Sequence, residues 1–176
     1  MHSGDREAER IMKVVELLRQ QTEGSTLEVT AEIAPSGELL CVSTESGPAT
    51  EEVWGADRCE FRLEVEPSEK ERLLRILLHS FWDEEKLSAW LEENGFRYQV
   101  QTAGERETEE TDGPAVRLPL SEESAPRELT VRGVSEDFLL LLQLRYLFEQ
   151  QYLGSLSEFH RFLESRKIPH TFQRVA

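Results

Sequence analysis

The chain has 176 residues, of which 38% are hydrophobic and 31% are charged, and its formal net charge is −15. A length of this order usually makes one domain with a sizeable core, so we expect residues 1–176 to form a single domain. The negative charge repels phosphate backbones and anionic lipids, which argues against direct nucleic-acid or membrane binding. The acidity indicates either simple solubility or a surface shaped for a basic protein partner.

Taken in chain order, the hydrophobic pattern first predicts a helix. Residues 5–22 place apolar side chains at helical spacing, and Gly24 would end that helix. A strand is expected over residues 26–33, because apolar and polar side chains alternate there. The Pro-Ser-Gly turn at 35–37 then predicts a hairpin with a second strand over 38–44.

The next segment, residues 45–57, is rich in Gly, Pro, Thr and acids, and this composition predicts a loop. A strand is expected over 59–67, after which Ser68 and Glu71 form the capping-box pattern that opens a helix. Trp54 stands alone among the polar residues of the loop. We expect it either to anchor a partner or to fold over a sheet edge.

A second helix and a strand are expected in the middle of the chain. Asp83 has the residue type that caps a helix, and the helix that follows would end in a left-handed turn at Gly95. Residues 96–101 then read as a strand.

A charged loop separates this region from the C-terminal part of the chain. Residues 103–114 are dominated by acids, which predicts a solvated loop. Two strands are expected beyond it, over 115–120 and 127–134. Ser135 then opens a helix over 136–152, which is apolar nearly all round and should run through the core.

The last segment is expected to hold one more helix and one more strand. Ser155 and Glu158 form a capping box, and Pro169 favours an extended chain that leads into a strand over 170–175. Residues 158–176 carry more basic than acidic side chains. We expect this basic end to dock on the chain's own sheet, with a partner contact as the alternative.

The order of these elements predicts the fold class. Residues 59–102 and 128–175 both read as strand, helix, helix and strand. The sequence therefore predicts an α+β fold, in which a mostly antiparallel sheet has helices packed on one face, with the two ranges as candidate related β-α-α-β units.

The two ranges can be aligned residue by residue over their strands and second helices. Val65 corresponds to Val131, and residues 90–101 align without gaps to residues 162–173. The second unit carries a short insertion in its first helix. The pattern arises either from duplication or from two independent units that obey the same capping and packing rules.

Two cysteines and the hydrophobic runs bear on the compartment. Cys41 and Cys59 lie in strand-like stretches without C-x-x-C spacing, so we expect buried thiols. Residues 1–10 are polar and show no secretory signal, and the most apolar run, 138–148, is short and interrupted by Arg145. We therefore expect a cytoplasmic protein.

The sequence offers little support for catalysis. It contains no Gly-rich phosphate loop, no G-x-S-x-G elbow and no H-x-x-x-H spacing. His79 reads as a structural residue at a helix end. Glu92 and Glu164 occupy matching places in the two units. Each follows an inward-facing leucine, so we expect each to be a solvent-exposed residue at the edge of its helix. We expect no metal, no cofactor and no enzymatic activity.

These observations favour a non-enzymatic acidic protein-binding module that neutralises or regulates a basic partner, as immunity proteins, antitoxins and nucleic-acid mimics do. The expected partner-binding residues are Glu51, Glu52, Trp54, Asp57, Glu107, Glu109, Glu110 and Asp112. One alternative is a structural or regulatory subunit of a larger complex. Another is a binder like the acidic secretion chaperones, which the chain resembles only in the order of its elements. A small enzyme is the least favoured reading, and self-association is left open.

Overall fold

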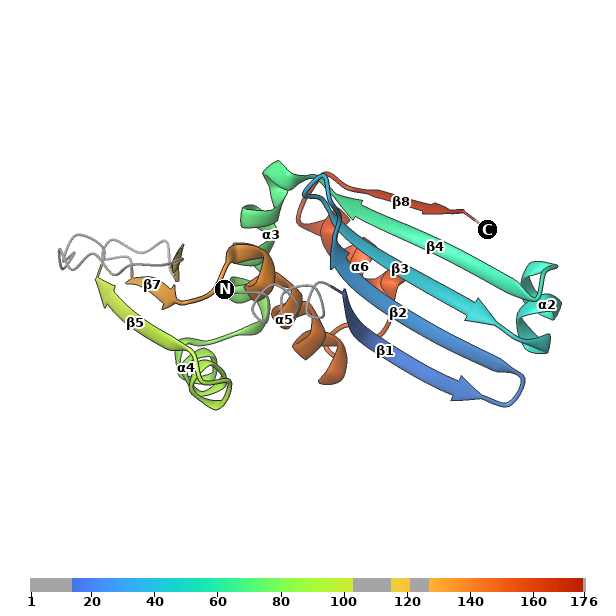
Figure 1. Ribbon diagram of the computed structural model, residues 1–176, viewed down its shortest axis with the longest axis horizontal. Helices are drawn as coiled ribbons and strands as arrows, with labels where there is room; N and C mark the ends of the chain where they lie inside the picture. The colour runs from blue at the N-terminus through green and yellow to red at the C-terminus, as the bar shows by residue number, and fades with distance from the viewer. Residues whose placement is uncertain (1–13, 103–114, 121–126, 176) are drawn as a thin grey trace, which may run out of the picture. The chain divides into compact units, whose positions relative to one another are not determined.

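The computed structural model describes residues 14–102, 115–120 and 127–175, and it confirms the α+β prediction (Figure 1). The strands pair antiparallel throughout the described residues, in one five-stranded and one three-stranded sheet. The chain divides into two compact units. Unit 1 combines residues 1–70 with 140–176, and unit 2 comprises residues 71–139.

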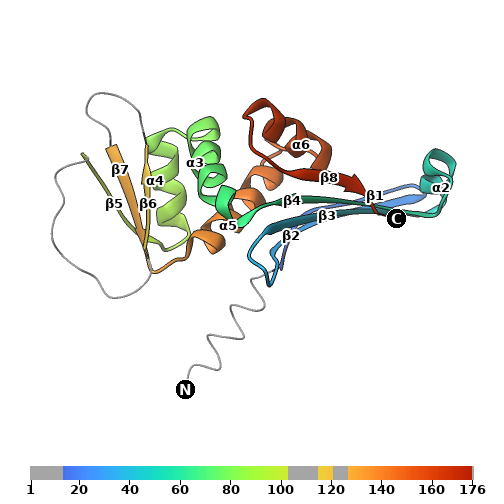
Figure 2. The same cartoon turned by 90° about the horizontal axis from the view of Figure 1, so that it is seen from above.

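Unit 1 is built on the five-stranded sheet. Its strands, in order across the sheet, are β1 (Val14–Thr22), β2 (Ser25–Ile33), β3 (Leu39–Ser46), β4 (Arg58–Val65) and β8 (Thr171–Arg174). Its helical segments are α2 (Pro48–Trp54), the short 3-10 helix η1 (Pro67–Glu69), α6 (Leu156–Ser165) and most of α5 (Glu136–Glu149). Figure 2 shows α6 lying over one face of this sheet.

The core of unit 1 follows from the alternation along the strands. Ala31 pairs with Cys41, Cys41 pairs with Leu63, and all three side chains are buried. Phe159 and Leu163 are buried on α6. Both cysteines are buried free thiols, as the sequence predicted. The basic C-terminal end does dock on the chain's own sheet, because β8 pairs with β4.

The predicted first helix is wrong over the described residues, because residues 14–22 form strand β1. A register shift between Glu16 and Leu18 breaks the two-residue alternation of this strand. Val15 is buried before the shift, Leu17 is buried at the shift itself, and Leu18 is half-buried after it. The adjacent apolar residues Leu17 and Leu18 interrupt the apolar–polar alternation of a strand, so the sequence pattern resembles that of a helix. Residues 5–13 lie outside the described part.

Three other boundaries also need correction. The predicted loop 45–57 contains helix α2, whose seven residues are too few for a clear periodic signal. Ser68 does not cap a helix, since it lies inside η1, which leads directly into the next helix at Lys70. Helix α5 ends at Glu149 rather than at residue 152.

Unit 2 packs helices against the three-stranded sheet. Its helices are α3 (Lys70–Phe81) and α4 (Glu84–Glu93), and its strands in spatial order are β5 (Arg97–Thr102), β7 (Arg127–Arg132) and β6 (Ala115–Pro119). Figure 2 shows α4 against one face of this sheet. The aromatic rings of Trp82, Trp90 and Phe96 lie in a row, with centroid separations of 5.6 and 5.9 Å.

The predicted ends of α4 are confirmed. Asp83 Oδ1 accepts a hydrogen bond from the backbone N–H of Lys86 at 2.7 Å. At the other end, Gly95 has a φ of 74°, and the N–H of Phe96 returns to the carbonyl of Leu91 at 3.0 Å. This left-handed turn sends the chain into β5.

The two β-α-α-β ranges exchange their strands. The first strand of the first range, β4, pairs with the last strand of the second range, β8. Likewise, β7 pairs with β5. Each sheet therefore contains one strand from the start of one range and one strand from the end of the other.

The registers of these two strand pairs agree with the sequence alignment. Leu63 lies opposite Phe172 in one sheet, and Leu129 lies opposite Val100 in the other. The alignment matches Leu63 with Leu129 and Phe172 with Val100. Equivalent residues of the two ranges therefore lie opposite equivalent partners, as the duplication hypothesis predicts.

Candidate functional site

The first candidate site is a surface on and beside α2, which we call the α2 surface: Glu51, Glu52, Val53, Trp54 and Asp57. Four of these five residues were expected from the sequence to bind a partner. The other expected residues, Glu107, Glu109, Glu110 and Asp112, lie outside the described residues.

Glycines hold α2 in place at both ends. Gly47 has a φ of 122°, and a Cβ atom there would lie 2.4 Å from the carbonyl oxygen of Gly24 in the β1–β2 turn. The same carbonyl accepts the N–H of Ala49 at 2.9 Å. Gly55 ends the helix in the left-handed conformation, with a φ of 77°. Because Gly47 has no side chain, α2 can start in direct contact with the β1–β2 hairpin.

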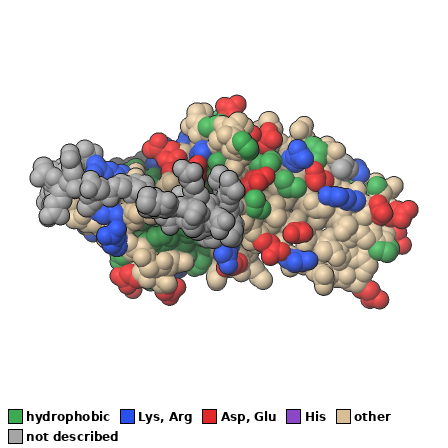
Figure 3. Space-filling model, viewed as in Figure 1, with side chains coloured by type: hydrophobic (Ala, Val, Ile, Leu, Met, Phe, Trp, Pro, Cys, Tyr) green, Lys and Arg blue, Asp and Glu red, His purple; other side chains and the backbone are tan. Residues whose placement is uncertain are grey.

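The side chains of α2 divide into an inner and an outer set. Thr50 is fully buried, whereas Glu51 and Glu52 are exposed and Val53 is 71% exposed. Figure 3 shows acidic side chains gathered at the end of unit 1 where Figure 1 labels α2. An exposed Val beside acids gives a binding surface both an apolar contact and a charge.

Trp54 combines the two roles that the sequence left open. Its ring packs edge-on against Phe61 of β4, with centroids 5.6 Å apart, so it does fold over the sheet. The guanidinium of Arg174 lies 5.3 Å from the centroid of the Trp54 ring. Trp54 nevertheless remains 39% exposed, which leaves part of the residue accessible to a partner.

Ion pairing distinguishes the α2 surface from the face of the sheet that α6 does not cover. On that face acids and arginines are interspersed (Figure 3), and Glu60 pairs with Arg58 at 3.6 Å and Arg62 at 3.3 Å. Within the part of the chain that the structure describes, the carboxylates of Glu51, Glu52 and Asp57 take part in no ion pair. Among the described residues these three carboxylates are therefore outside any ion pair, while Arg174 places one positive charge beside Trp54.

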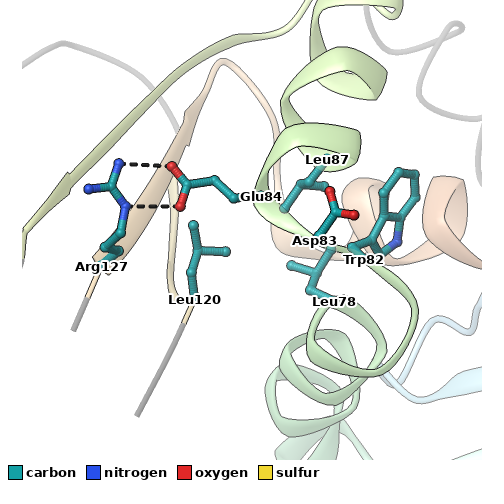
Figure 4. A pocket seen from close by; sticks show the side chains of 7 residues that line it. All are labelled: Leu78, Trp82, Asp83, Glu84, Leu87, Leu120 and Arg127. Atoms are coloured by element: carbon teal, nitrogen blue, oxygen red, sulfur yellow. Dashed lines mark hydrogen bonds and ion pairs between the residues drawn. The ribbon is translucent and has the colours of Figure 1, made fainter. Parts of the chain in front are cut away.

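The second candidate is a pocket of about 140 Å³ in unit 2 (Figure 4). It is lined by Leu78, Trp82, Asp83, Glu84, Leu87, Leu120 and Arg127. Arg127 donates two hydrogen bonds to Glu84, at 2.9 and 2.8 Å. Asp83 already accepts the N–H that caps α4. Both carboxylates are thus engaged in structural contacts, and the pocket offers no carboxylate held ready for acid–base chemistry.

The third candidate comprises the two corners that hold Glu92 and Glu164. At the α4–β5 corner, the Tyr98 hydroxyl donates to Glu92 Oε1 at 2.6 Å. This hydrogen bond raises the pKa of Tyr98, an effect that a further hydrogen bond with Ser88 partly offsets. Glu92 is exposed, as the sequence indicated, and it also accepts this hydrogen bond at the corner.

At the α6–β8 corner, Glu164 interacts with a pair of histidines. Glu164 Oε1 lies 2.8 Å from His160 Nε2, and His160 Nδ1 lies 2.7 Å from His170 Nε2. The sequence analysis missed this pair because His160 and His170 are separated by a helix end and a turn. The alignment of the two ranges was the available signal, since it matches His160 and His170 with Ser88 and Tyr98.

The described residues hold no metal cluster of three or more His, Cys, Asp or Glu ligands and no helix that is long and apolar enough to cross a bilayer. No protein-family model, curated protein or solved structure matches this chain.

Proposed function

We propose that this chain is a non-enzymatic, cytoplasmic protein-binding module whose α2 surface binds a basic protein. The observation that carries the proposal is the exposed Val53, flanked by the locally unpaired carboxylates of Glu51 and Glu52. A partner with Lys or Arg side chains would neutralise these acids while it covers the apolar side chain.

The charge of the chain favours such a partner. Uncompensated carboxylates attract a basic surface at long range and raise the rate of encounter. The apolar residues then act after contact, because a partly exposed Trp beside a Val can hold the partner in place. The two sets of residues therefore predict separate effects on the association and dissociation rates.

The alternatives find less support in the described residues. A subunit with an apolar interface would expose a contiguous apolar patch. The exposed large hydrophobic side chains are few: Val14, Val53, Trp54, Tyr152 and Val175. An enzyme would hold carboxylates in a cleft, whereas those of the unit 2 pocket serve an ion pair and a helix cap. These observations favour a binding module over both alternatives.

The test is a kinetic measurement against a protein that co-purifies with the tagged full chain. Association and dissociation rates are measured at 50 and 300 mM salt for the parent and for Glu51→Lys/Glu52→Lys. The matched control is Glu71→Lys/Glu85→Lys, which reverses two exposed acids in unit 2. We expect the α2 variant to slow association about tenfold at low salt, and the control to have a much smaller effect.

Val53→Ala and Trp54→Ala test the apolar contribution. Each is expected to raise the dissociation rate several-fold and to leave the association rate nearly unchanged. An association rate that ignores both salt and the Glu51 and Glu52 charges would refute the acidic-surface proposal. The subunit alternative would then be preferred.

A further inference from the structure

The α6–β8 corner orients two histidines toward one point. His160 Nδ1 and His170 Nε2 face each other at 2.7 Å. The second nitrogen of each ring faces an oxygen: His160 Nε2 lies 2.8 Å from Glu164 Oε1, and His170 Nδ1 lies 2.8 Å from the carbonyl of Ile168. The Phe172 ring stacks on His160 with centroids 4.5 Å apart, which helps to fix its orientation.

The hydrogen-bonding partners determine where the ring protons lie. A carboxylate and a backbone carbonyl only accept hydrogen bonds, so the nitrogens that face Glu164 and Ile168 must carry the N–H. A neutral imidazole has a single N–H. With these tautomers, His160 Nδ1 and His170 Nε2 direct lone pairs at each other at 2.7 Å, and a cation between them, either a proton or a metal ion, would relieve their repulsion.

We propose that the His160–His170 pair is a binding site for a divalent transition-metal ion of the zinc type. Imidazole nitrogen is a preferred ligand of such ions. Metal-bound histidines usually donate their other N–H to a carboxylate or a backbone carbonyl, and both acceptors are present here. The inference does not depend on the proposed function.

The geometry requires only a small movement. Zn–N bonds of about 2.0–2.1 Å in a tetrahedral site place two nitrogens about 3.3 Å apart, so the rings would separate by roughly 0.6 Å. His160 keeps 27% of its side-chain surface exposed, so an ion can reach it from solvent. Water completes the coordination, since the described residues provide no third His, Cys, Asp or Glu ligand.

The α4–β5 corner shows that the fold does not need histidine at these positions. Ser88, Glu92 and Tyr98 align with His160, Glu164 and His170. At the α4–β5 corner, the Tyr98 hydroxyl donates a hydrogen bond to the Glu92 carboxylate at 2.6 Å. The shared backbone plan therefore does not by itself dictate the two imidazoles of the other corner.

The test is calorimetric titration of the metal-free full chain with Zn²⁺, in the presence of millimolar Mg²⁺ to occupy oxygen-only sites. We expect one equivalent of zinc to bind with micromolar affinity. The variants His170→Tyr and His160→Ser/His170→Tyr introduce the residues of the sister corner, and each should weaken binding at least a hundredfold. Glu164→Gln should weaken binding about tenfold, because it alters only the support of the ligand.

His79→Ala is the matched control, since it removes a histidine whose Nε2 contacts the carbonyl of Pro119 in unit 2. It should bind zinc as the parent does. Thermal melts without metal verify that each variant folds. In the parent, ¹⁵N spectra of the imidazoles should show the zinc shift at His160 Nδ1 and His170 Nε2. Affinity weaker than millimolar, or equal affinity in His170→Tyr, would overturn the proposal and leave a shared proton as the cation.

Discussion

The α4–β5 corner of unit 2 and the α6–β8 corner of unit 1 follow the same backbone plan with different side chains. In both, the third residue after the helix returns its N–H to a buried leucine, from Phe96 to Leu91 and from Ile168 to Leu163, at 3.0 Å each. The residue just before it has a positive φ, 74° at Gly95 and 57° at Lys167. Capping and core packing thus fix the turn, and the polar positions around it are free to differ.

The largest expected contrast between the units is in thiol reactivity. Both cysteines lie in unit 1, and burial raises the pKa of Cys41 to about 12. We expect an aromatic disulfide reagent at pH 8 to react with Cys41 at least a hundredfold more slowly in the native state than in urea. With Trp54 of unit 1 replaced by Phe, the remaining fluorescence of Trp82 and Trp90 meanwhile follows unit 2. Fast labelling while that fluorescence stays native would show that unit 1 opens alone.

The same thiol predicts a loss of stability at alkaline pH. The folded-state pKa lies above the ordinary value of 9.0, so the folded state retains a proton that the unfolded state loses between pH 9 and 12. The stabilising contribution of Cys41 is complete below pH 9 and declines as the pH rises. Urea unfolding at pH 8 and pH 10.5 checks the sign, with Cys41→Ala expected to flatten the dependence.

Truncation of the matched leucines compares the two cores. Leu91 and Leu163 are both fully buried, and replacing either with Ala should cost about 2–5 kcal/mol of unfolding free energy, measured in urea. Arg161→Ala, at an exposed position on α6, should change it by less than about 0.5 kcal/mol. A cost under about 1 kcal/mol at only one of the leucines would break the equivalence of the corners.

The matched helix caps should give smaller effects. Asp83 accepts the N–H of Lys86, and Ser155 accepts the N–H of Glu158 at 3.1 Å. Each Ala substitution should cost about 1 kcal/mol in urea unfolding. Ser157→Ala, beside the second cap, serves as the control. Unequal costs would show that one helix depends on its cap and the other on packing.

Substitutions at the two residues with left-handed backbone, Gly95 and Lys167, should change the stability of the fold in opposite directions. Nothing lies within 4 Å of a Cβ atom placed on Gly95, so Gly95→Ala should cost about 1 kcal/mol through backbone strain alone. Lys167→Gly should stabilise by about 0.5–1 kcal/mol, because glycine relieves the strain at some cost in unfolded-state entropy. Thermal melts measure both changes. A destabilised Lys167→Gly would mean that the lysine side chain itself stabilises the turn.

Sequence reasoning was most successful where one local signal determined the structure. The alternation in β2, the Asp83 cap and the Gly95 turn all appear as predicted. It failed at β1, where the strand pattern is interrupted at the bulge and resembles that of a helix. It also failed at α2, which is too short to show a helical period of hydrophobic residues. The ends of α6 and β8 brought His160 and His170 together without any spacing motif.

The exchange of strands between the two ranges has a consequence for synthesis. More than a hundred residues separate Glu64 of β4 from its partner Thr171 of β8. At about 5–20 residues per second, a ribosome needs roughly 5–20 seconds to make the residues between them. Throughout that interval the outer edge of β4, which carries Phe61 and Leu63, presents open backbone donors and acceptors. The nascent chain is therefore most exposed to wrong pairing just before its final strand emerges.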